Sequence, residues 1–219
     1  MSSTRMGLLT LVSVFIPGPA QGQSAMEVLE AASSSYGALA SFCASFEQAL
    51  HVPLLGQTTD SRGRLCQARP DRFAMIFSEP EGDRVIADGE WLWVYYPSMD
   101  PVQVFRSPLT GGEGRFDFHR EFLFQPGARY APTLEGREDL NGTATHRIHL
   151  QPRGESPLRE ARVWITQNGS EIRKVEIHEA NGSVRTVRLG AMERNPALPS
   201  DFFGFTPPAN SQILTMPGS

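Results

Sequence analysis

The spacing of apolar positions predicts one helix near the start of the chain, followed by strands. Ser24 and Glu27 have the spacing of a capping box, and apolar residues then recur at steps of three and four as far as Gly37. Between Phe42 and Phe46 the period changes to two, because apolar and polar residues alternate. The pattern therefore predicts an amphipathic helix that leads directly into a half-buried strand.

Strand-like segments make up most of the remaining chain, and turn residues separate them. Asp88-Gly89, Asn168-Gly169 and Asn181-Gly182 are dipeptides that accept the backbone angles of tight hairpins. This pattern predicts a mainly β, α+β fold with a single curved antiparallel sheet of about ten strands. The predicted strands are 41–50, 57–69, 72–79, 84–88, 91–96, 101–106, 145–150, 158–166, 172–179 and 184–192.

The middle of the chain interrupts the strands. Three glycines in 111–114 predict a flexible loop, and the segment 116–124 follows it. Phe118 and Phe122 share one face of this segment if it is helical, and Pro126 ends it. We therefore expect a short, mobile helix between two groups of strands.

The first 22 residues have the features of a secretory signal. Arg5 precedes an apolar run over 6–16, and Ala20-Gln21-Gly22 offers small residues at both recognition positions of a cleavage site. The alternative is an uncleaved, buried N-terminal helix. We expect residues 1–22 to be a signal peptide and residues 23–219 to form one domain that is soluble outside the inner membrane.

Composition excludes several classes of protein. Forty per cent of the residues are hydrophobic and 20% are charged, which suits a globular core rather than a disordered chain. The 20 basic and 24 acidic residues give a formal net charge of -4, so no excess positive charge is available to neutralise phosphates. Nucleic acid is therefore not an expected partner.

Candidate chemistry is sparse. His146 and His149 stand three residues apart in a predicted strand, so their side chains point to opposite faces and do not share an ion easily. His51, His119 and His178 occur singly in polar surroundings, as surface histidines do. No nucleophile elbow, phosphate loop or dinucleotide motif is present. The sequence predicts no catalytic residue, no metal site and no cofactor.

Aromatic and methionine side chains are concentrated on the predicted strands and the short helix. They have two interpretations: an ordinary filled core, or a concave apolar lining for a greasy ligand under a helix on a glycine hinge. Both fit the same periodicity. The residues concerned are Phe73, Met75, Phe77, Trp91, Trp93, Tyr95, Phe118 and Phe122.

The two cysteines are placed to meet across a hairpin. A turn centred between Leu54 and Leu55 sets Cys43 directly opposite Cys66, within the separation that a disulfide accepts. An oxidising compartment would permit the bond. The alternative is two free, half-buried thiols, and a one-residue bulge that turns the side chains to opposite faces would produce it.

Five motifs occur in one order along the chain. They are 41–48 (Ser-Phe-Cys-Ala-Ser-Phe-Glu-Gln), Gly63-Arg64-Leu65, Arg69-Pro70-Asp71-Arg72-Phe73, Asp88-Gly89 with Leu92-Trp93-Val94-Tyr95 and Pro97, and Phe205-Thr206-Pro207-Pro208. In this order they resemble the periplasmic outer-membrane lipoprotein carrier family of the LolA type. The resemblance covers nearly the whole chain after residue 22. It departs from the better-known members at Cys43 and Cys66, and in a short tail after Pro208.

The resemblance implies an incomplete, curved antiparallel β-barrel of about ten to eleven strands, with the N-terminal helix and a helical lid over a hydrophobic cavity. It implies a periplasmic, non-enzymatic carrier that takes lipoproteins by their acyl chains. An inner-membrane lipoprotein-releasing ABC transporter would supply them, an outer-membrane lipoprotein receptor would accept them, and the carrier would be a monomer. Two alternatives stay open: a periplasmic carrier or sensor of another lipid or glycolipid, and a secreted hydrolase.

The resemblance also nominates residues. Arg69 matches a family arginine that bonds to lid backbone and helps to hold the closed state, with a plain surface arginine as the alternative. The residues expected to line the acyl cavity are Phe46, Phe73, Met75, Phe77, Trp93, Tyr95, Phe118 and Phe122.

Overall fold

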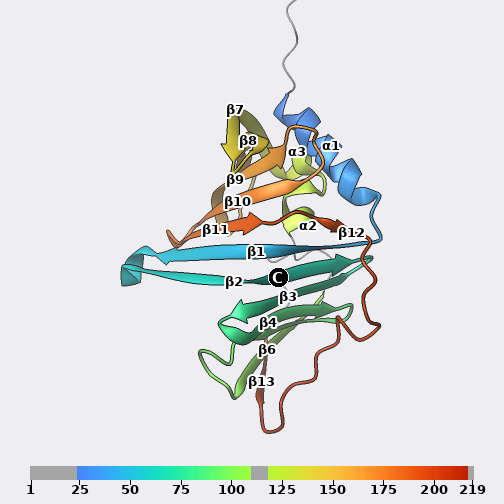
Figure 1. Ribbon diagram of the computed structural model, residues 1–219. Coiled ribbons are helices and arrows are strands. Elements are labelled where there is room, and N and C mark those ends of the chain that lie inside the picture. The colour runs from blue at the N-terminus through green and yellow to red at the C-terminus, as the bar shows by residue number, and fades with distance from the viewer. Residues whose placement is uncertain (1–23, 110–117, 217–219) are drawn as a thin grey trace, which may run out of the picture.

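The protein folds as one open, curved sheet with helices against one of its faces (Figure 1). The computed structural model describes residues 24–109 and 118–216. The predicted signal peptide, residues 1–22, lies outside the described residues. Within the described part, no helix is long and apolar enough to cross a membrane.

Within the described ranges, three α-helices and one 3-10 turn accompany the sheet. They are α1 (Ala25–Gly37), η1 (Pro53–Leu55), α2 (Phe118–Leu123) and α3 (Pro126–Arg129). The predicted capping box of α1 is confirmed: the Glu27 amide donates to Ser24 Oγ at 3.2 Å, and the Ser24 amide donates to Glu27 Oε2 at 2.7 Å. The sequence signal at Ser24 thus fixes where the first helix begins.

The sheet contains 13 strands in the described residues. The bounds are β1 Ser41–Val52, β2 Gln57–Ala68, β3 Arg72–Glu79, β4 Glu81–Asp88, β5 Trp91–Tyr95, β6 Gln103–Pro108, β7 Tyr130–Leu140, β8 Thr143–Pro152, β9 Leu158–Thr166, β10 Ile172–Glu179, β11 Val184–Leu189, β12 Glu193–Arg194 and β13 Gln212–Thr215. Their order is β13-β6-β5-β4-β3-β2-β1-β11-β10-β9-β8-β7, and β12 pairs with β1. The predicted mainly β class and curved antiparallel sheet are confirmed.

The predicted strand number was too low because three strands carry weak signals. β7 is an edge strand whose side chains are mostly exposed, so its sequence lacks a clear alternation. β12 spans only two residues, and β13 reaches β6 in parallel after a long connection. Edge strands and short strands need little burial, so apolar periodicity does not mark them.

Alternation along the strands creates two separate apolar layers. The larger layer lies on the concave face, where side chains of β1–β4 and β8–β11 pack against α1 and α2. The smaller layer lies on the convex face, where residues 198–205 pack over β1–β4. We call residues 195–211 the C-terminal strap, because this segment crosses the convex face before β13 (Figure 1).

The β1–β2 hairpin has the register expected from the sequence. Cys43 pairs with Cys66 across the two strands, and a disulfide joins them beneath Phe203 of the C-terminal strap. Gly63 in β2 sits where a Cβ atom would clash with the Ile76 carbonyl oxygen. This close backbone approach explains why the Gly-Arg-Leu motif begins with glycine.

Candidate functional site

The concave face is the main apolar surface of the molecule, and α1 and α2 cover part of it. Val28, Leu29 and Ala32 of α1 are fully buried against the sheet. Phe122 of α2 is fully buried in the same cluster. The helices therefore fill this part of the concavity with their own side chains.

Five of the predicted cavity residues come together on this face. Phe46, Phe73, Met75 and Phe77 project from β1 and β3 into the cluster that contains Phe122, and each is at most 6% exposed. Phe46 and Phe77 make an edge-on ring contact, with centroids 5.1 Å apart. In this closed arrangement these side chains contact the helices and each other. The Phe118 backbone lies at the start of α2, and the structure does not describe its side chain.

Trp93 and Tyr95 lie on the opposite face, so their assignment to the cavity was wrong. Trp93 pairs with Ile86, which belongs to the convex layer. Its indole Nε1 donates to Asp88 Oδ2 at 2.7 Å, and its ring lies 5.6 Å from that of Phe205 in the C-terminal strap. The Tyr95 ring likewise packs against Phe205, at 5.8 Å. Both side chains therefore anchor the strap.

The alternate residues of β5 face the concave side, and the sequence analysis did not assign them to the cavity. Leu92, Val94 and Tyr96 are only partly buried at the margin of the concave cluster, together with Leu109. The register of two successive hairpins contains the signal: Met75 pairs with Val85, and Val85 pairs with Val94. Following this pairing from β3 would have placed the cavity residues of β5 correctly.

Arg69 lies at the end of β2, against the C-terminal end of α1. Its Nε donates to the Leu39 carbonyl oxygen at 2.7 Å, and its NH2 group donates to the Tyr36 carbonyl oxygen at 3.0 Å. A guanidinium at this point also complements the negative end of the helix dipole. One bond thus reaches the last turn of α1, and the other reaches the connection between α1 and β1. Neither reaches the short helix of residues 116–124, which the sequence analysis took as the lid.

A crevice of about 370 Å³ opens beside Arg69, between α1, α2 and the adjacent ends of β1 and β2. Tyr36, Phe42 and Leu123 give it apolar walls, and Asp71 contributes to its polar rim. Arg120 of α2 pairs with Asp71 at 3.2 Å. Polar contacts therefore hold both helices at this edge of the site.

A second polar cluster holds the end of α2. The Glu121 carboxylate accepts a hydrogen bond from the Tyr130 hydroxyl and lies 2.7 Å from the Arg129 guanidinium. Burial, together with the bond to Glu121, raises the pKa of Tyr130. Within α1, burial likewise raises the pKa of Tyr36, whose hydroxyl accepts from the Ile172 amide at 3.1 Å. These phenols stay neutral, which suits hydrogen bonding at the margin of an apolar layer.

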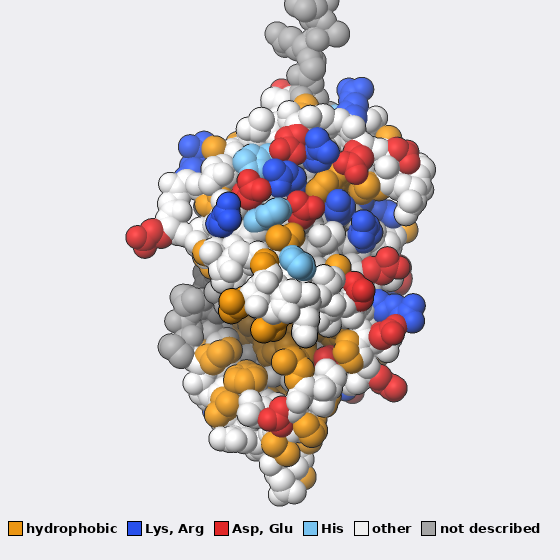
Figure 2. All heavy atoms as spheres, turned by 90° about the vertical axis from the view of Figure 1, so that its left-hand side faces the viewer, with side chains coloured by type: hydrophobic (Ala, Val, Ile, Leu, Met, Phe, Trp, Pro, Cys, Tyr) orange, Lys and Arg blue, Asp and Glu red, His pale blue; other side chains and the backbone are white. Residues whose placement is uncertain are grey.

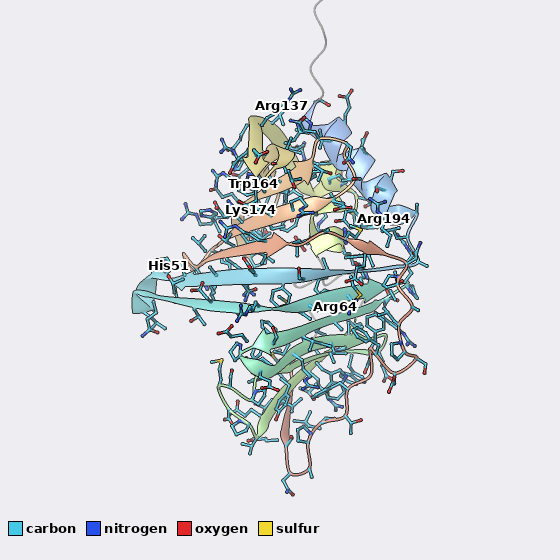
Figure 3. All side chains as sticks on the ribbon, in the orientation of Figure 1. His51, Arg64, Arg137, Trp164, Lys174 and Arg194 are labelled. Atoms are coloured by element: carbon cyan, nitrogen blue, oxygen red, sulfur yellow. A yellow bond between two sulfur atoms is a disulfide. The ribbon has the colours of Figure 1, made fainter. Side chains whose placement is uncertain are left out.

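The convex face of β8–β10 has a different character, because charged residues in cross-strand pairs cover it. Glu160 lies between Arg162 and His149, at 2.9 and 3.0 Å. Burial opposes ionisation of Glu160, but bonds from these two neighbours outweigh it and lower the pKa. Lys174 lies 3.8 Å above the Trp164 ring, and Figure 3 shows both on this face. Such a surface does not suit acyl chains.

The five histidines lie in different surroundings. No group of three or more potential ligands occurs among the described residues. His149 and His178 take part in the ion pairs on the convex face of β8–β10, and His51 contacts Thr58 Oγ1. His119 does not match the expectation of a surface histidine in polar surroundings, because its ring packs against those of Tyr36 and Phe42. His146 is only 3% exposed, and its burial lowers its pKa.

This geometry defines a half-barrel class of protein, in which helices partly cover the apolar inner face of an open sheet. The family model described as "Outer membrane lipoprotein carrier protein LolA" matches residues 38–111, the stretch from the end of α1 past β6. Together with the similar proteins described next, this match confirms the resemblance to the LolA family that the motifs indicated.

Curated relatives extend the match over most of the chain. An "Outer-membrane lipoprotein carrier protein" of Dechloromonas aromatica is 27% identical over 179 residues, which cover 78% of this chain and 79% of the relative. The protein of the same name in Alkalilimnicola ehrlichii is 28% identical over 170 residues, covering 74% and 75%. The Legionella pneumophila protein is 24% identical and covers 88% of this chain and 90% of its own.

Solved structures share the fold. An uncharacterized conserved protein from Thermus thermophilus superposes with a TM-score of 0.58 at 14% identity, covering 89% of this chain and 100% of that one. The Pseudomonas aeruginosa MucA/MucB complex contains a chain with a TM-score of 0.50 at 13% identity, covering 88% of this chain and 64% of that one. At these identities the likeness concerns the fold alone.

Proposed function

We propose that the protein carries lipoproteins by binding their acyl chains on the concave face. One observation carries this proposal: the apolar layer on that face continues from under α1 and α2 to the partly exposed residues Leu92, Val94 and Tyr96. An apolar surface that is part covered and part open suits a ligand that enters when the cover moves.

The energetics of acyl chains explain why a carrier is needed. Each methylene exposed to water costs about 0.8 kcal/mol, so a chain of ~16 carbons costs on the order of 12 kcal/mol. Lipoproteins that leave one membrane for another therefore need an apolar host for their anchors. The curved sheet offers such a host without an energy source of its own.

Loading requires the helices to move, because the cavity side chains under them are nearly fully buried. Phe46, Phe73 and Met75 are 1%, 5% and 1% exposed while the helices are in place. Acyl chains would take the place of α1 and α2, and the return of the helices would expel them. Arg69 is positioned to bias this exchange, since its two bonds exist only while the α1 end is docked.

The setting is proposed from the resemblance of the motifs and from the predicted signal peptide. Residues 23–219 act as one periplasmic, monomeric and non-enzymatic domain after removal of residues 1–22. The protein would receive lipoproteins from an inner-membrane ABC transporter and pass them to an outer-membrane receptor. The relatives' shared name, outer-membrane lipoprotein carrier protein, supports lipoproteins as the cargo.

Two neighbouring residues of β5 provide a matched test. Val94→Asp places a carboxylate on the concave face, whereas Tyr95→Asp places one on the convex face of the same strand. We expect Val94→Asp to abolish loading with a purified triacylated lipoprotein and Tyr95→Asp to leave loading largely intact, because an unpaired charge excludes acyl chains.

Circular dichroism controls for folding in both variants, and Leu92→Asp serves as a second concave substitution. Normal loading by folded Val94→Asp and Leu92→Asp would contradict the concave-face proposal.

A further inference from the structure

One end of the sheet carries exposed hydrophobic side chains on two separate loops. β1, β3 and β5 run in the same direction because each antiparallel neighbour reverses the chain, so the η1 turn and the β5–β6 loop emerge at the same end. Both lie at the left-hand end of the sheet in Figure 1. The side chains are Leu54 and Leu55, which are 92% and 64% exposed, and Met99 and Val102, which are 83% and 53% exposed. We call these four residues the apolar rim.

The hairpin that carries the two leucines is uncharged along its outer part. Between Glu47 and Asp60 the sequence has no Asp, Glu, Lys or Arg. His51, at this end in Figure 3, is the one ionisable side chain of that stretch, and it contacts Thr58 Oγ1 at 3.1 Å. An uncharged tip can enter hydrocarbon or neutral polar surroundings without desolvating an ion.

The other groups at this end are mildly acidic. Asp100 lies between Met99 and Val102, and its carboxylate accepts from the Val102 amide at 3.0 Å. In the β3–β4 turn, Glu79 pairs with Arg62, while Glu81 is exposed. This charge would oppose an anionic surface and tolerate a zwitterionic one.

One of the two loops of the apolar rim begins at the margin of the concave face. Figure 2 looks at this end and shows hydrophobic side chains gathered over the lower half around a hollow, while charged and histidine side chains cover the upper half. Tyr96 links the two regions: its side chain packs at the margin of the concave layer, and its carbonyl oxygen accepts the amides of Met99 and Asp100, each at 3.0 Å. The β5–β6 loop of the apolar rim therefore starts at the margin of the concave layer.

We propose that the apolar rim is a membrane-docking site that inserts into the interface of a zwitterionic phospholipid bilayer. Side chains on projecting loop tips do not form a groove for a protein segment, but leucine and methionine there can enter the boundary between headgroups and acyl chains. The inference rests on the proposed function, because docking would place the open side of the concave face against the membrane that takes up or releases acyl chains.

The test uses the chain 23–219 without cargo, floated with phosphatidylcholine vesicles and with vesicles in which about a quarter of the lipid is phosphatidylglycerol. We expect wild-type protein to float with phosphatidylcholine vesicles, and we expect the anionic lipid not to increase the fraction that floats. Leu54→Ser with Leu55→Ser should lower the partition coefficient by about tenfold or more, since two exposed leucines lose their transfer free energy.

The matched control is Leu134→Ser with Met216→Ser, which removes two exposed apolar side chains, 36% and 42% exposed, from β7 and from the residue after β13. This control should float like wild type. Failure of wild type to float, binding only to anionic vesicles, or equal loss in both double variants would overturn the proposal. So would unchanged flotation of the leucine variant together with failed delivery to the membrane protein partners, because the rim would then be a protein interface.

Loading of the same variants with purified lipoprotein separates this proposal from the carrier function. Leu54 and Leu55 lie outside the concave layer, so loading should persist in the leucine variant. Lost flotation with normal loading supports the docking site. If wild type floats but does not load, the carrier function fails while the docking site stands.

Discussion

Arg69→Leu should make the protein hold acyl chains more tightly, because it removes two bonds that stabilise the closed arrangement. The guanidinium donates to the Leu39 and Tyr36 carbonyl oxygens at the C-terminal end of α1. Leucine preserves the aliphatic part of this side chain but has no hydrogen-bond donor. The substitution thus acts on the docking of α1 and leaves the concave lining unchanged.

The size of the effect follows from these two bonds. A hydrogen bond contributes about 0.5–1.5 kcal/mol net, and the exposed Arg69 head can bond to water after release, so we take about 0.7 kcal/mol for each. Their sum of about 1.4 kcal/mol corresponds to a tenfold shift from closed to open. If only the open form binds, the apparent dissociation constant for an acyl ligand should fall by about tenfold.

The assay is a fluorescence titration of cargo-free protein with a polyene fatty acid whose emission rises in apolar surroundings. Arg72→Leu is the matched control, because Arg72 is exposed close by and donates no hydrogen bond to the described residues of the helices. Arg69→Lys should restore part of the wild-type affinity, since an ammonium lacks the planar fork that reaches two carbonyls. Unchanged or weaker binding by Arg69→Leu, or an equal change in Arg72→Leu, would refute the reasoning.

Three further predictions concern stability. Phe73→Glu should lower the free energy of unfolding by more than about 3 kcal/mol in urea titrations, because Phe73 is 5% exposed in the concave layer; a stable, folded variant would show that this layer opens freely. Replacing Cys43 and Cys66 together by Ala should cost up to about 3 kcal/mol, from a disulfide that closes a separation of 23 residues; two free thiols in unreduced protein would remove the basis of this expectation. Burial lowers the pKa of His146 in the folded protein, and Arg137 acts in the same direction. As the pH falls, His146 is therefore protonated at a higher pH in the unfolded chain than in the folded protein. The free energy of unfolding should therefore decrease below about pH 6.5, and His146→Leu should weaken that dependence; an identical pH profile in the variant would contradict this assignment.

Local signals predicted those elements that bury one face regularly. The capping box at Ser24 and the alternation from Phe42 to Phe46 marked the first helix and strand, and the turn at Leu54 fixed the register of the β1–β2 hairpin. β7, β12 and β13 escaped because edge and very short strands bury too little for apolar periodicity to appear.

The candidate site was predicted in part, and the errors have a geometric origin. In β5 the large aromatic residues were assigned to the cavity, whereas Trp93 and Tyr95 instead anchor the C-terminal strap on the convex face. Residue size does not decide which face a side chain occupies, because a 13-stranded sheet with a strap has an apolar layer on both sides. The register carried across successive hairpins does decide it, and it selects Leu92 and Val94.

The filled state of the concave face could not be derived from the sequence at all. Periodicity places Phe73 and Met75 on one face, but the same pattern fits a permanent core and a cavity that helices occupy between cargoes. The docking of Val28 and Leu29 of α1 on these residues depends on contacts between distant parts of the chain. Such contacts leave no local signal.

Mass spectrometry of what the protein holds when isolated from the periplasm tests the central claim most directly. The chain 23–219 would be purified without detergent, in parallel with Val94→Asp as the variant that should hold nothing. The account predicts acylated polypeptide, with diacylglyceryl and N-acyl chains on an N-terminal cysteine, bound to wild type and absent from the variant. Free phospholipid or glycolipid alone, or the products of a cleaved ester, would contradict a lipoprotein carrier.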